Sequence, residues 1–247
     1  MKKIGVFGDS ILKGIQMDSE TKKYILKNHI DLDKIGRKHL ISIDNFSMFG
    51  CTINKGYSLL QRRLEKRYFD IVLLEYGGSD CDFNWAKIAE DPYRNHIPNT
   101  PLSIFVDIYI KMIKKLKEKR IEAILTTLPP LEPQRFFDWF CNGLNKNNIL
   151  KWLGTVNTIY RWQEKYSRAI ERIGLLTNTI VIDLRGAFLN HLRVDELLCE
   201  DGIHPNTKGQ NIITETLLNF SWENYIKNNV CTSRVIPSQL PPNEPEN

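Results

Sequence analysis

Five short apolar segments recur along the chain, and segments of helical periodicity separate them. We expect strands at residues 3–7, 40–46, 70–76, 122–127 and 179–184. The segments 71–74 and 180–182 are apolar at every position, which is typical of strands covered on both faces. Strands that alternate with helices favour a parallel sheet with helices packed on both faces. The chain is therefore expected to be an α/β protein with a central five-stranded parallel sheet.

Four longer segments carry the pattern of helices. They cover residues 54–68, 102–119, 156–173 and 206 to about 227, and the first three place apolar or aromatic side chains three and four residues apart. Pro101 stands at the first turn of the second helix, where a helix tolerates proline. Gly174 is expected to end the third helix, because glycine readily adopts the left-handed conformation of a helix end.

The length of 247 residues suits one large domain with a substantial core. We assign residues 1–231 to a single domain and residues 232–247, which are rich in proline, asparagine, serine and glutamate, to a flexible tail. The formal charge of +5 is modest, and the basic runs at 62–67 and 111–117 keep apolar residues at helical spacing. These runs indicate solvated helix faces, so nucleic-acid binding is not expected.

The five cysteines are scattered and form no Cys-x-x-Cys pair, so neither a disulfide framework nor a metal site is indicated. No glycine-rich phosphate loop of the expected spacing is present, which argues against a nucleotide-binding or receiver domain. The apolar run after Lys3 is too short for a signal peptide, and no stretch reaches the roughly 18 apolar residues of a membrane span. We therefore expect a cytoplasmic protein that requires no metal or organic cofactor.

The sequence Gly8-Asp9-Ser10 follows the first expected strand and precedes a helix-compatible segment at 11–15. Taken alone, it has two interpretations. The simpler one is a turn that caps a helix. The other is a nucleophilic serine held where strand becomes helix, because free backbone N–H groups at a helix start favour the negative charge of an oxyanion.

Gly50 lies just past the second expected strand, and Gly77 follows the third. The carboxyl ends of parallel strands meet at one edge of a sheet, where ligands bind in such folds. Ser10, Gly50 and Gly77 are therefore expected to gather at that edge. Ser10 and Gly50 can each supply a backbone N–H to an oxyanion, since glycine lets a backbone approach closely.

A nucleophilic serine needs a base, and the base needs an orienting acid. His204 lies in a loop after the fifth expected strand, and Asp201 precedes it by three residues across Gly202. Both side chains can share that loop, with Asp201 reaching the far ring nitrogen of His204. We interpret the remaining histidines as surface residues, apart from a weak candidate for substrate contact in the first long loop; they are His29, His39, His96 and His191.

Two long connections, 81–101 and 129–152, lie on the same side of the expected sheet as Ser10 and are rich in aromatic residues. Long loops in a compact domain are usually functional, and aromatic richness disfavours disorder. One interpretation is a helical hairpin that buries its own aromatic side chains. The other is a lid or wall of a substrate pocket, with Phe83, Trp85 and Trp139 in contact with substrate.

Four sequence blocks in this order resemble the SGNH/GDSL family of serine esterases and lipases over nearly the whole chain. The blocks are Gly8-Asp9-Ser10, Gly50, Gly77-Gly78-Ser79-Asp80 and Asp201-Gly202-Ile203-His204-Pro205. The resemblance implies a three-layer flavodoxin-like fold with Ser10 as nucleophile, His204 as base and Asp201 as its partner. It also implies an oxyanion hole formed by Ser10, Gly50 and the side chain at position 79. Asp9 joins the candidate substrate contacts.

The third block departs from the family pattern, which reads Gly-x-Asn-Asp, because Ser79 replaces the asparagine. A serine hydroxyl is shorter than an asparagine amide. Losing one oxyanion donor lowers turnover by about 10²–10³-fold. We therefore expect reduced activity, and we expect Asp80 to hold its loop by hydrogen bonds.

The leading hypothesis is an esterase that hydrolyses small acyl, acetyl-sugar or lysophospholipid esters through an acyl-enzyme. The alternative is a catalytically weakened or non-catalytic protein of the same fold that binds carbohydrate or lipid. Fold and triad do not choose among these substrates.

Overall fold

The computed structural model describes residues 1–27, 29–222 and 235–236. Its central sheet is parallel throughout and carries the five expected strands, each end within two residues of its expected position. A sixth, two-residue strand extends one edge. The strand order across the sheet is β4 (Ile41–Asn45), β1 (Lys2–Gly8), β5 (Ile71–Glu75), β6 (Glu122–Thr126), β7 (Ile180–Ile182) and β8 (Val235–Ile236).

The order of the strands creates one switch point, between β1 and β5. From β1 the chain moves to β4 on one side, and from β5 onward it continues on the other side. Gly8 at the end of β1 is in register with Glu75 at the end of β5. The segments that follow these two strands therefore start side by side, at the place where such folds bind their ligands.

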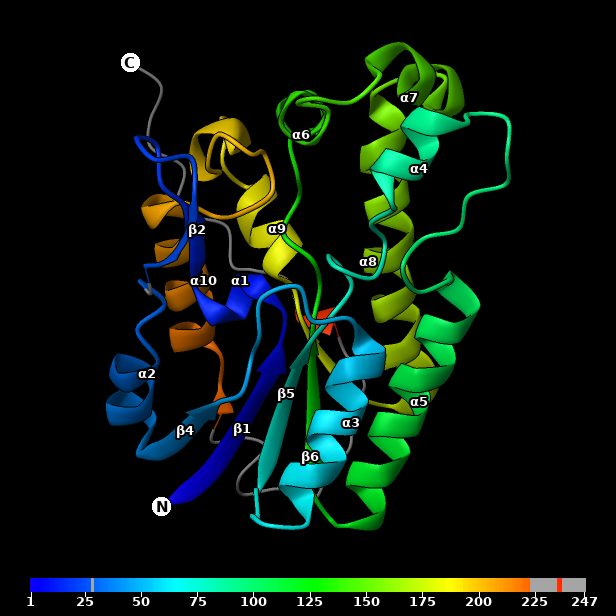
Figure 1. Cartoon of the computed structure of the whole chain (residues 1–247). Coiled ribbons are helices and arrows are strands. Elements are labelled where there is room, and N and C mark those ends of the chain that lie inside the picture. The colour runs from blue at the N-terminus through cyan, green and yellow to red at the C-terminus, as the bar shows by residue number, and fades with distance from the viewer. Residues whose placement is uncertain (28, 223–234, 237–247) are drawn as a thin grey trace.

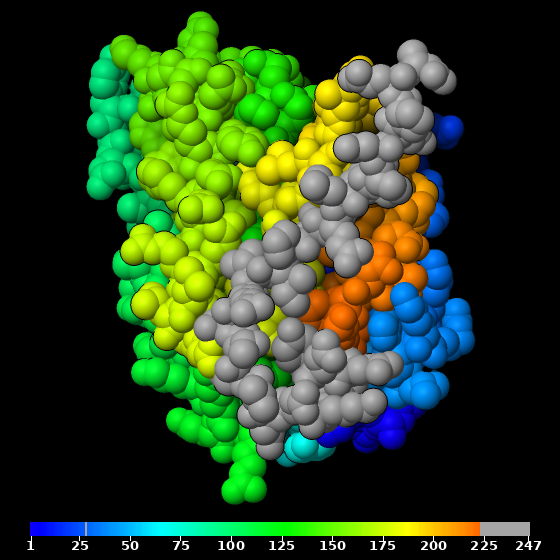
Figure 2. Space-filling model, turned by 180° about the vertical axis from the view of Figure 1, so that it is seen from behind, coloured from blue at the N-terminus to red at the C-terminus, as the bar shows by residue number. Residues whose placement is uncertain are grey.

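Helices cover both faces of the sheet (Figure 1). The helices on one face are α3 (Ile53–Leu64), α5 (Leu102–Glu118) and α8 (Asn157–Thr177); those on the other are α2 (Leu32–His39), α9 (Leu184–Leu189) and α10 (Thr207–Asn219). Alternate strand residues divide between the two cores, with Phe7 in one and Val6 in the other. Seen from behind, α8 and α10 lie on either side of the segment that follows β7 (Figure 2).

Helices that lie beyond the carboxyl ends of the strands (Figure 1) contribute a third cluster of buried side chains. Its members come chiefly from α4 (Trp85–Glu90), α6 (Pro133–Phe140) and α7 (Lys146–Leu153), which form most of the two long connections. Trp85 stacks on Phe140 with ring centroids 4.0 Å apart. The aromatic side chains of these connections therefore form a small core of their own, beside the sheet edge that carries Ser10.

A short hairpin that the sequence did not indicate follows the first helix. Helix α1 (Ser10–Lys13) ends at Gly14, whose φ of 79° is left-handed. The strands β2 (Ile15–Met17) and β3 (Tyr24–Leu26) then pair antiparallel with each other in a separate two-stranded sheet. Three-residue strands are too short to show a periodic pattern, so composition alone could not reveal them.

The predicted end of α8 at Gly174 is wrong. The helix continues to Thr177 and ends at Asn178, which has a φ of 51°. Gly174 is required for packing instead, because a Cβ atom there would lie 2.4 Å from Cγ2 of Val181 in β7. Helix α10 also ends earlier than predicted, at Asn219.

The predicted tail, 232–247, lies outside the described residues except for Val235 and Ile236. These two form β8 and pair with Val181 and Ile182 of β7.

Candidate active site

Ser10 is the first residue of α1, directly after β1. Asp9 caps this helix, since its carboxylate accepts a hydrogen bond from the Ile11 backbone N–H at 3.0 Å. Gly8 packs against β5, where a Cβ atom would lie 2.7 Å from Oε2 of Glu75. Ser10 is 8% exposed. Its position is thus fixed by the strand behind it and by the cap beside it.

The loop that carries Asp201 and His204 is closed by hydrogen bonds within itself. The Cys199 backbone N–H donates to the His204 carbonyl at 2.8 Å, and Oδ1 of Asp201 accepts the backbone N–H groups of Ile203 and His204, both at 3.1 Å. Gly202 has a φ of 73°, a left-handed conformation that favours glycine. These contacts turn both side chains of the Asp-x-x-His segment toward the same place.

One continuous chain of hydrogen bonds joins Asp201, His204 and Ser10. Nδ1 of His204 lies 2.6 Å from Oδ2 of Asp201, and Nε2 of His204 lies 2.9 Å from Oγ of Ser10. Asp201 is 0% and His204 3% exposed. A carboxylate only accepts, so Nδ1 of a neutral His204 carries the proton and Nε2 is free to accept the proton of the Ser10 hydroxyl. The structure thus brings together the three residues of the predicted triad.

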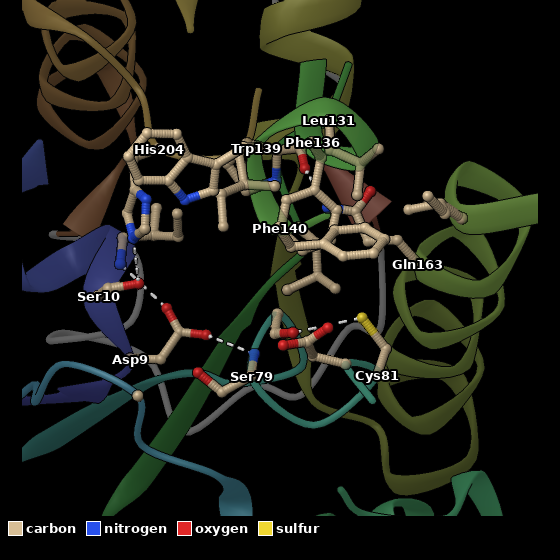
Figure 3. A pocket seen from close by; sticks show the side chains of 18 of the residues that line it. Asp9, Ser10, Ser79, Cys81, Leu131, Phe136, Trp139, Phe140, Gln163 and His204 are labelled. Atoms are coloured by element: carbon tan, nitrogen blue, oxygen red, sulfur yellow. Dashed lines mark hydrogen bonds between the residues drawn. The ribbon is translucent and has the colours of Figure 1, made fainter. Parts of the chain in front are cut away.

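Gly50 and Ser79 line the same cavity as Ser10. Figure 3 shows Ser10 and Ser79 at this cavity. The backbone N–H groups of Ser10 and Gly50 donate to no other residue that the structure describes. Gly50 has a φ of 63°, and the space where a Cβ atom would stand is open. The Ser79 backbone N–H, by contrast, donates to Oδ2 of Asp9 at 3.3 Å. Ser79 can therefore reach the cavity with its hydroxyl but not with its N–H.

Asp9 and Asp80 hold the loops around Ser10. Asp9 links the turn after β1 to the loop after β5 through Ile11 and Ser79. Asp80 accepts the Ile53 backbone N–H at 2.9 and 3.1 Å and so joins the same loop to the start of α3. Burial raises the pKa of Asp80 to about 7. The predicted substrate contact of Asp9 remains untested, although this residue lines the cavity.

A cavity of about 380 Å³ extends from Ser10 and His204 to the aromatic cluster. The three predicted aromatic contacts, Phe83, Trp85 and Trp139, all line it. Figure 3 shows Ser10, Asp9 and Ser79 along one side, with Trp139, Phe136 and Phe140 opposite. The aromatic side chains of the long connections therefore pack against one another and also line the cavity, while their contact with substrate stays a prediction.

Sequence reasoning missed several residues that line the cavity, among them Tyr24, Asp82 and Gln163. Oη of Tyr24 accepts a hydrogen bond from Nε1 of Trp139 at 2.8 Å, and its ring lies 4.9 Å from that of His204. Burial raises the pKa of the Tyr24 hydroxyl. No sequence signal points to Tyr24, because the short strands of its hairpin show no periodic pattern. Asp82 could have been noticed, because it stands two residues after the Gly77-Gly78-Ser79-Asp80 block.

Among the residues described, no group of three or more histidine, cysteine, aspartate or glutamate side chains could hold a metal ion. None of the described helices has both the length and the apolar character that a transmembrane segment requires.

The fold and this site are those of an α/β serine hydrolase. The chain belongs to the GDSL-like lipase/acylhydrolase family, whose model matches residues 6–212. It is accordingly a hydrolase that acts on ester bonds. No curated protein matches the chain.

Solved structures share the fold at low sequence identity. A lipase/acylhydrolase from Enterococcus faecalis has a TM-score of 0.62 and 21% identity, covering 97% of this chain and 100% of its own. An esterase from Pseudoalteromonas has a TM-score of 0.60 and 16% identity, covering 92% and 100%. A variant of an acetyl-xylooligosaccharide esterase from Geobacillus has a TM-score of 0.58 and 19% identity, covering 90% and 95%.

Proposed function

We propose that the protein hydrolyses carboxylic esters through a Ser10–His204–Asp201 triad and an acyl-enzyme intermediate. The observation that carries this proposal is the hydrogen-bond chain from Asp201 through His204 to Ser10, at 2.6 and 2.9 Å, at one end of the aromatic cavity. A buried aspartate that orients a histidine, which in turn contacts a serine hydroxyl, is the arrangement that activates a serine for attack.

In the first half of the reaction, Ser10 Oγ attacks the ester carbonyl while Nε2 of His204 takes the hydroxyl proton. The proton then passes from His204 to the departing alcohol, and the acyl group remains on Ser10. In the second half, His204 takes a proton from water, which attacks the acyl-enzyme, and returns it to Ser10 as the acid leaves. Asp201 keeps its negative charge and stabilises the positively charged imidazole that forms in each half.

The oxyanion of each tetrahedral intermediate is assigned to the backbone N–H groups of Ser10 and Gly50. Both groups lie at the cavity and donate to no other described residue, which supports this role. The third donor is the hydroxyl of Ser79. Two backbone donors and a short hydroxyl fit an enzyme of reduced turnover relative to one with an asparagine amide at this position.

A phosphonate probe that labels activated serines tests the proposal. We expect covalent labelling of the wild-type chain, complete loss of labelling in Ser10→Ala, and unchanged labelling in Ser58→Ala, whose side chain is exposed on α3. The Pseudoalteromonas esterase was itself crystallised with monoethylphosphonate as inhibitor. Absence of labelling in the wild type would favour the non-catalytic, carbohydrate- or lipid-binding alternative.

Substrate classes follow from the cavity and the relatives together. An aromatic wall accepts an acyl chain, an aryl group or a sugar ring. The relatives include a lipase/acylhydrolase and an esterase of acetylated xylooligosaccharides. Small acyl, acetyl-sugar and lysophospholipid esters are the corresponding candidates, and nitrophenyl esters from acetate to palmitate would rank them by chain length.

A further inference from the structure

Asp82 places a carboxyl group on the wall of the cavity, away from the triad. Its Oδ1 accepts a hydrogen bond from Nε1 of Trp85 at 2.8 Å, and its carbonyl accepts the Asn99 backbone N–H at 2.8 Å. Both the backbone and one carboxyl oxygen are thus held in place. Among the ion pairs of the described residues, none includes Asp82.

The other polar groups on this part of the wall are already engaged. Gln163 donates from Nε2 to the Pro129 carbonyl at 2.9 Å and accepts from Arg185 at 3.1 Å. The Asp9 carboxylate accepts two backbone N–H groups. The cavity lining contains no lysine or arginine, so Asp82 faces it without a neutralising charge.

The ring that contacts this carboxyl group belongs to a set of aromatic side chains on the cavity wall. Trp85, its hydrogen-bond donor, lies 5.6 Å from Phe83 between ring centroids, and Phe83 lies 5.3 Å from Trp162. All three rings line the cavity. Aromatic faces attract cations, and they do so more strongly where water is excluded. A carboxylate and aromatic rings that line the same cavity are a combination that binds an ammonium group.

The charge state of Asp82 favours a cation over a neutral hydroxyl as its partner. Burial raises the pKa of Asp82 to about 6. At pH 8 the group is therefore ionised, and it remains without a counter-charge in a partly desolvated place. A bound ammonium group supplies that charge and recovers Coulomb energy, whereas a sugar hydroxyl supplies only a hydrogen bond.

We propose that the cavity selects carboxylic esters that carry an ammonium or quaternary ammonium group, and that Asp82 is the residue that recognises this group. The inference rests on the proposed esterase function and narrows its substrate class. The lining also predicts that anionic esters are poor substrates, because their negative charge would face Asp82 and Asp9 with no lysine or arginine beside it.

Two pairs of isosteric esters test the inference on the full chain at pH 8. The first pair is acetylcholine and its carbon analogue, in which a tert-butyl group replaces the trimethylammonium group. The second pair places the same two groups at the end of the acyl chain of a methyl ester. We expect kcat/KM to be about tenfold or more higher for the cationic member of at least one pair. Tetramethylammonium should inhibit hydrolysis of the neutral ester competitively, and sodium at equal ionic strength should not.

In Asp82→Asn the cationic preference should fall toward one, while Asp107→Asn, an exposed substitution on α5, should retain it. The asparagine side-chain oxygen in Asp82→Asn can still accept the hydrogen bond from Trp85, so this variant should remain folded. Unfolding curves of the two variants check this. Equal kcat/KM values within both pairs, or a preference that survives in Asp82→Asn, would overturn the inference while Ser10 labelling still supports the esterase. Failure to hydrolyse any ester, together with no labelling of Ser10, would overturn both.

Discussion

The Glu75 side chain accepts a hydrogen bond from the backbone N–H of Asp9, with Oε2 and the nitrogen 3.1 Å apart. Both residues are fully buried, Glu75 at the end of β5 and Asp9 directly before the serine. Burial raises the pKa of each carboxyl group, and for Glu75 the negative charge of Asp9 adds to the effect. The Glu75 carboxyl group is therefore held in its protonated, neutral form next to the turn that carries Ser10.

Glu75→Gln should preserve this arrangement, because glutamine keeps an oxygen acceptor for the Asp9 N–H and resembles the protonated acid. Glu75→Ala removes the acceptor and leaves a cavity, so it should lower the free energy of unfolding by about 2–4 kcal/mol. Urea unfolding of both variants measures the difference. Equal destabilisation by glutamine and alanine would show that the hydrogen bond to Asp9 contributes nothing.

The stability of the protein should fall as the pH rises from about 5 to 8. Burial raises the pKa of Asp80 from 3.8 to about 7 and that of Asp82 from 3.8 to about 6. A carboxyl group whose pKa is higher in the folded chain contributes stability that is full below the unfolded pKa and is lost as the pH rises through the folded pKa. Asp80→Asn, which cannot ionise, should flatten the upper part of this curve. Stability that rises from pH 5 to 8 in the wild type would contradict the expectation.

Asp201→Asn should lower kcat by about 10³–10⁴-fold with little effect on the fold. The asparagine oxygen can still accept the backbone N–H groups of Ile203 and His204, but an amide in place of Oδ2 no longer stabilises a charged imidazole. Steady-state kinetics on a nitrophenyl ester would measure the loss. An activity within tenfold of the wild type would remove Asp201 from the triad.

Ser79→Asn should raise turnover, by up to about 10²-fold if the longer amide supplies a full oxyanion donor. The backbone N–H at this position is engaged by Asp9, so only the side chain can change the number of donors. The comparison should use kcat, since an oxyanion donor acts on the transition state. Turnover that stays the same or falls would mean that position 79 is not the third donor.

Tyr24 and Trp139 should behave as a coupled pair. Their hydrogen bond joins the β2–β3 hairpin to α6 beside His204. Tyr24→Phe and Trp139→Phe each remove it, so the double variant should be less destabilised than the sum of the two, with a coupling energy of about 1 kcal/mol. Thermal unfolding of the wild type, the two single variants and the double variant measures this coupling energy. Strictly additive losses of unfolding free energy would mean that the contact does not stabilise the fold.

The sheet and the site were predictable to different depths. The strands could be placed because segments such as Ile71–Glu75 are apolar throughout, and a strand buried on both faces needs that composition. Ser10 could be selected because it follows the end of β1 in a recognisable block, and Asp201 and His204 because they stand in a recognisable block just before α10. Tyr24 could not, since it reaches His204 through a three-residue strand that pairs only with its neighbour.

The glycines illustrate what the sequence cannot specify. A glycine at position 174 is typical of a helix end, but this glycine lies within α8 and leaves room for the side chain of Val181 in β7. Such contacts between distant segments are decided by packing, which no local pattern reports. Asp82 stands two residues past the third block and could have been noticed there, but its place on the cavity wall depends on the packing of Trp85 and the long connections.

The contact between Gly202 and Glu132 ties the reaction chemistry to the shape of the pocket. The Glu132 backbone N–H, at the start of α6, donates to the Gly202 carbonyl at 2.8 Å, and a Cβ atom at Gly202 would lie 2.6 Å from the Glu132 carbonyl oxygen. The loop that carries His204 is therefore held directly against the start of α6, whose aromatic side chains line the cavity. Substitutions that change the shape of α6 to admit other esters will also shift the side chain of His204. Substitutions meant to change substrate range should therefore be made in α4 and α7.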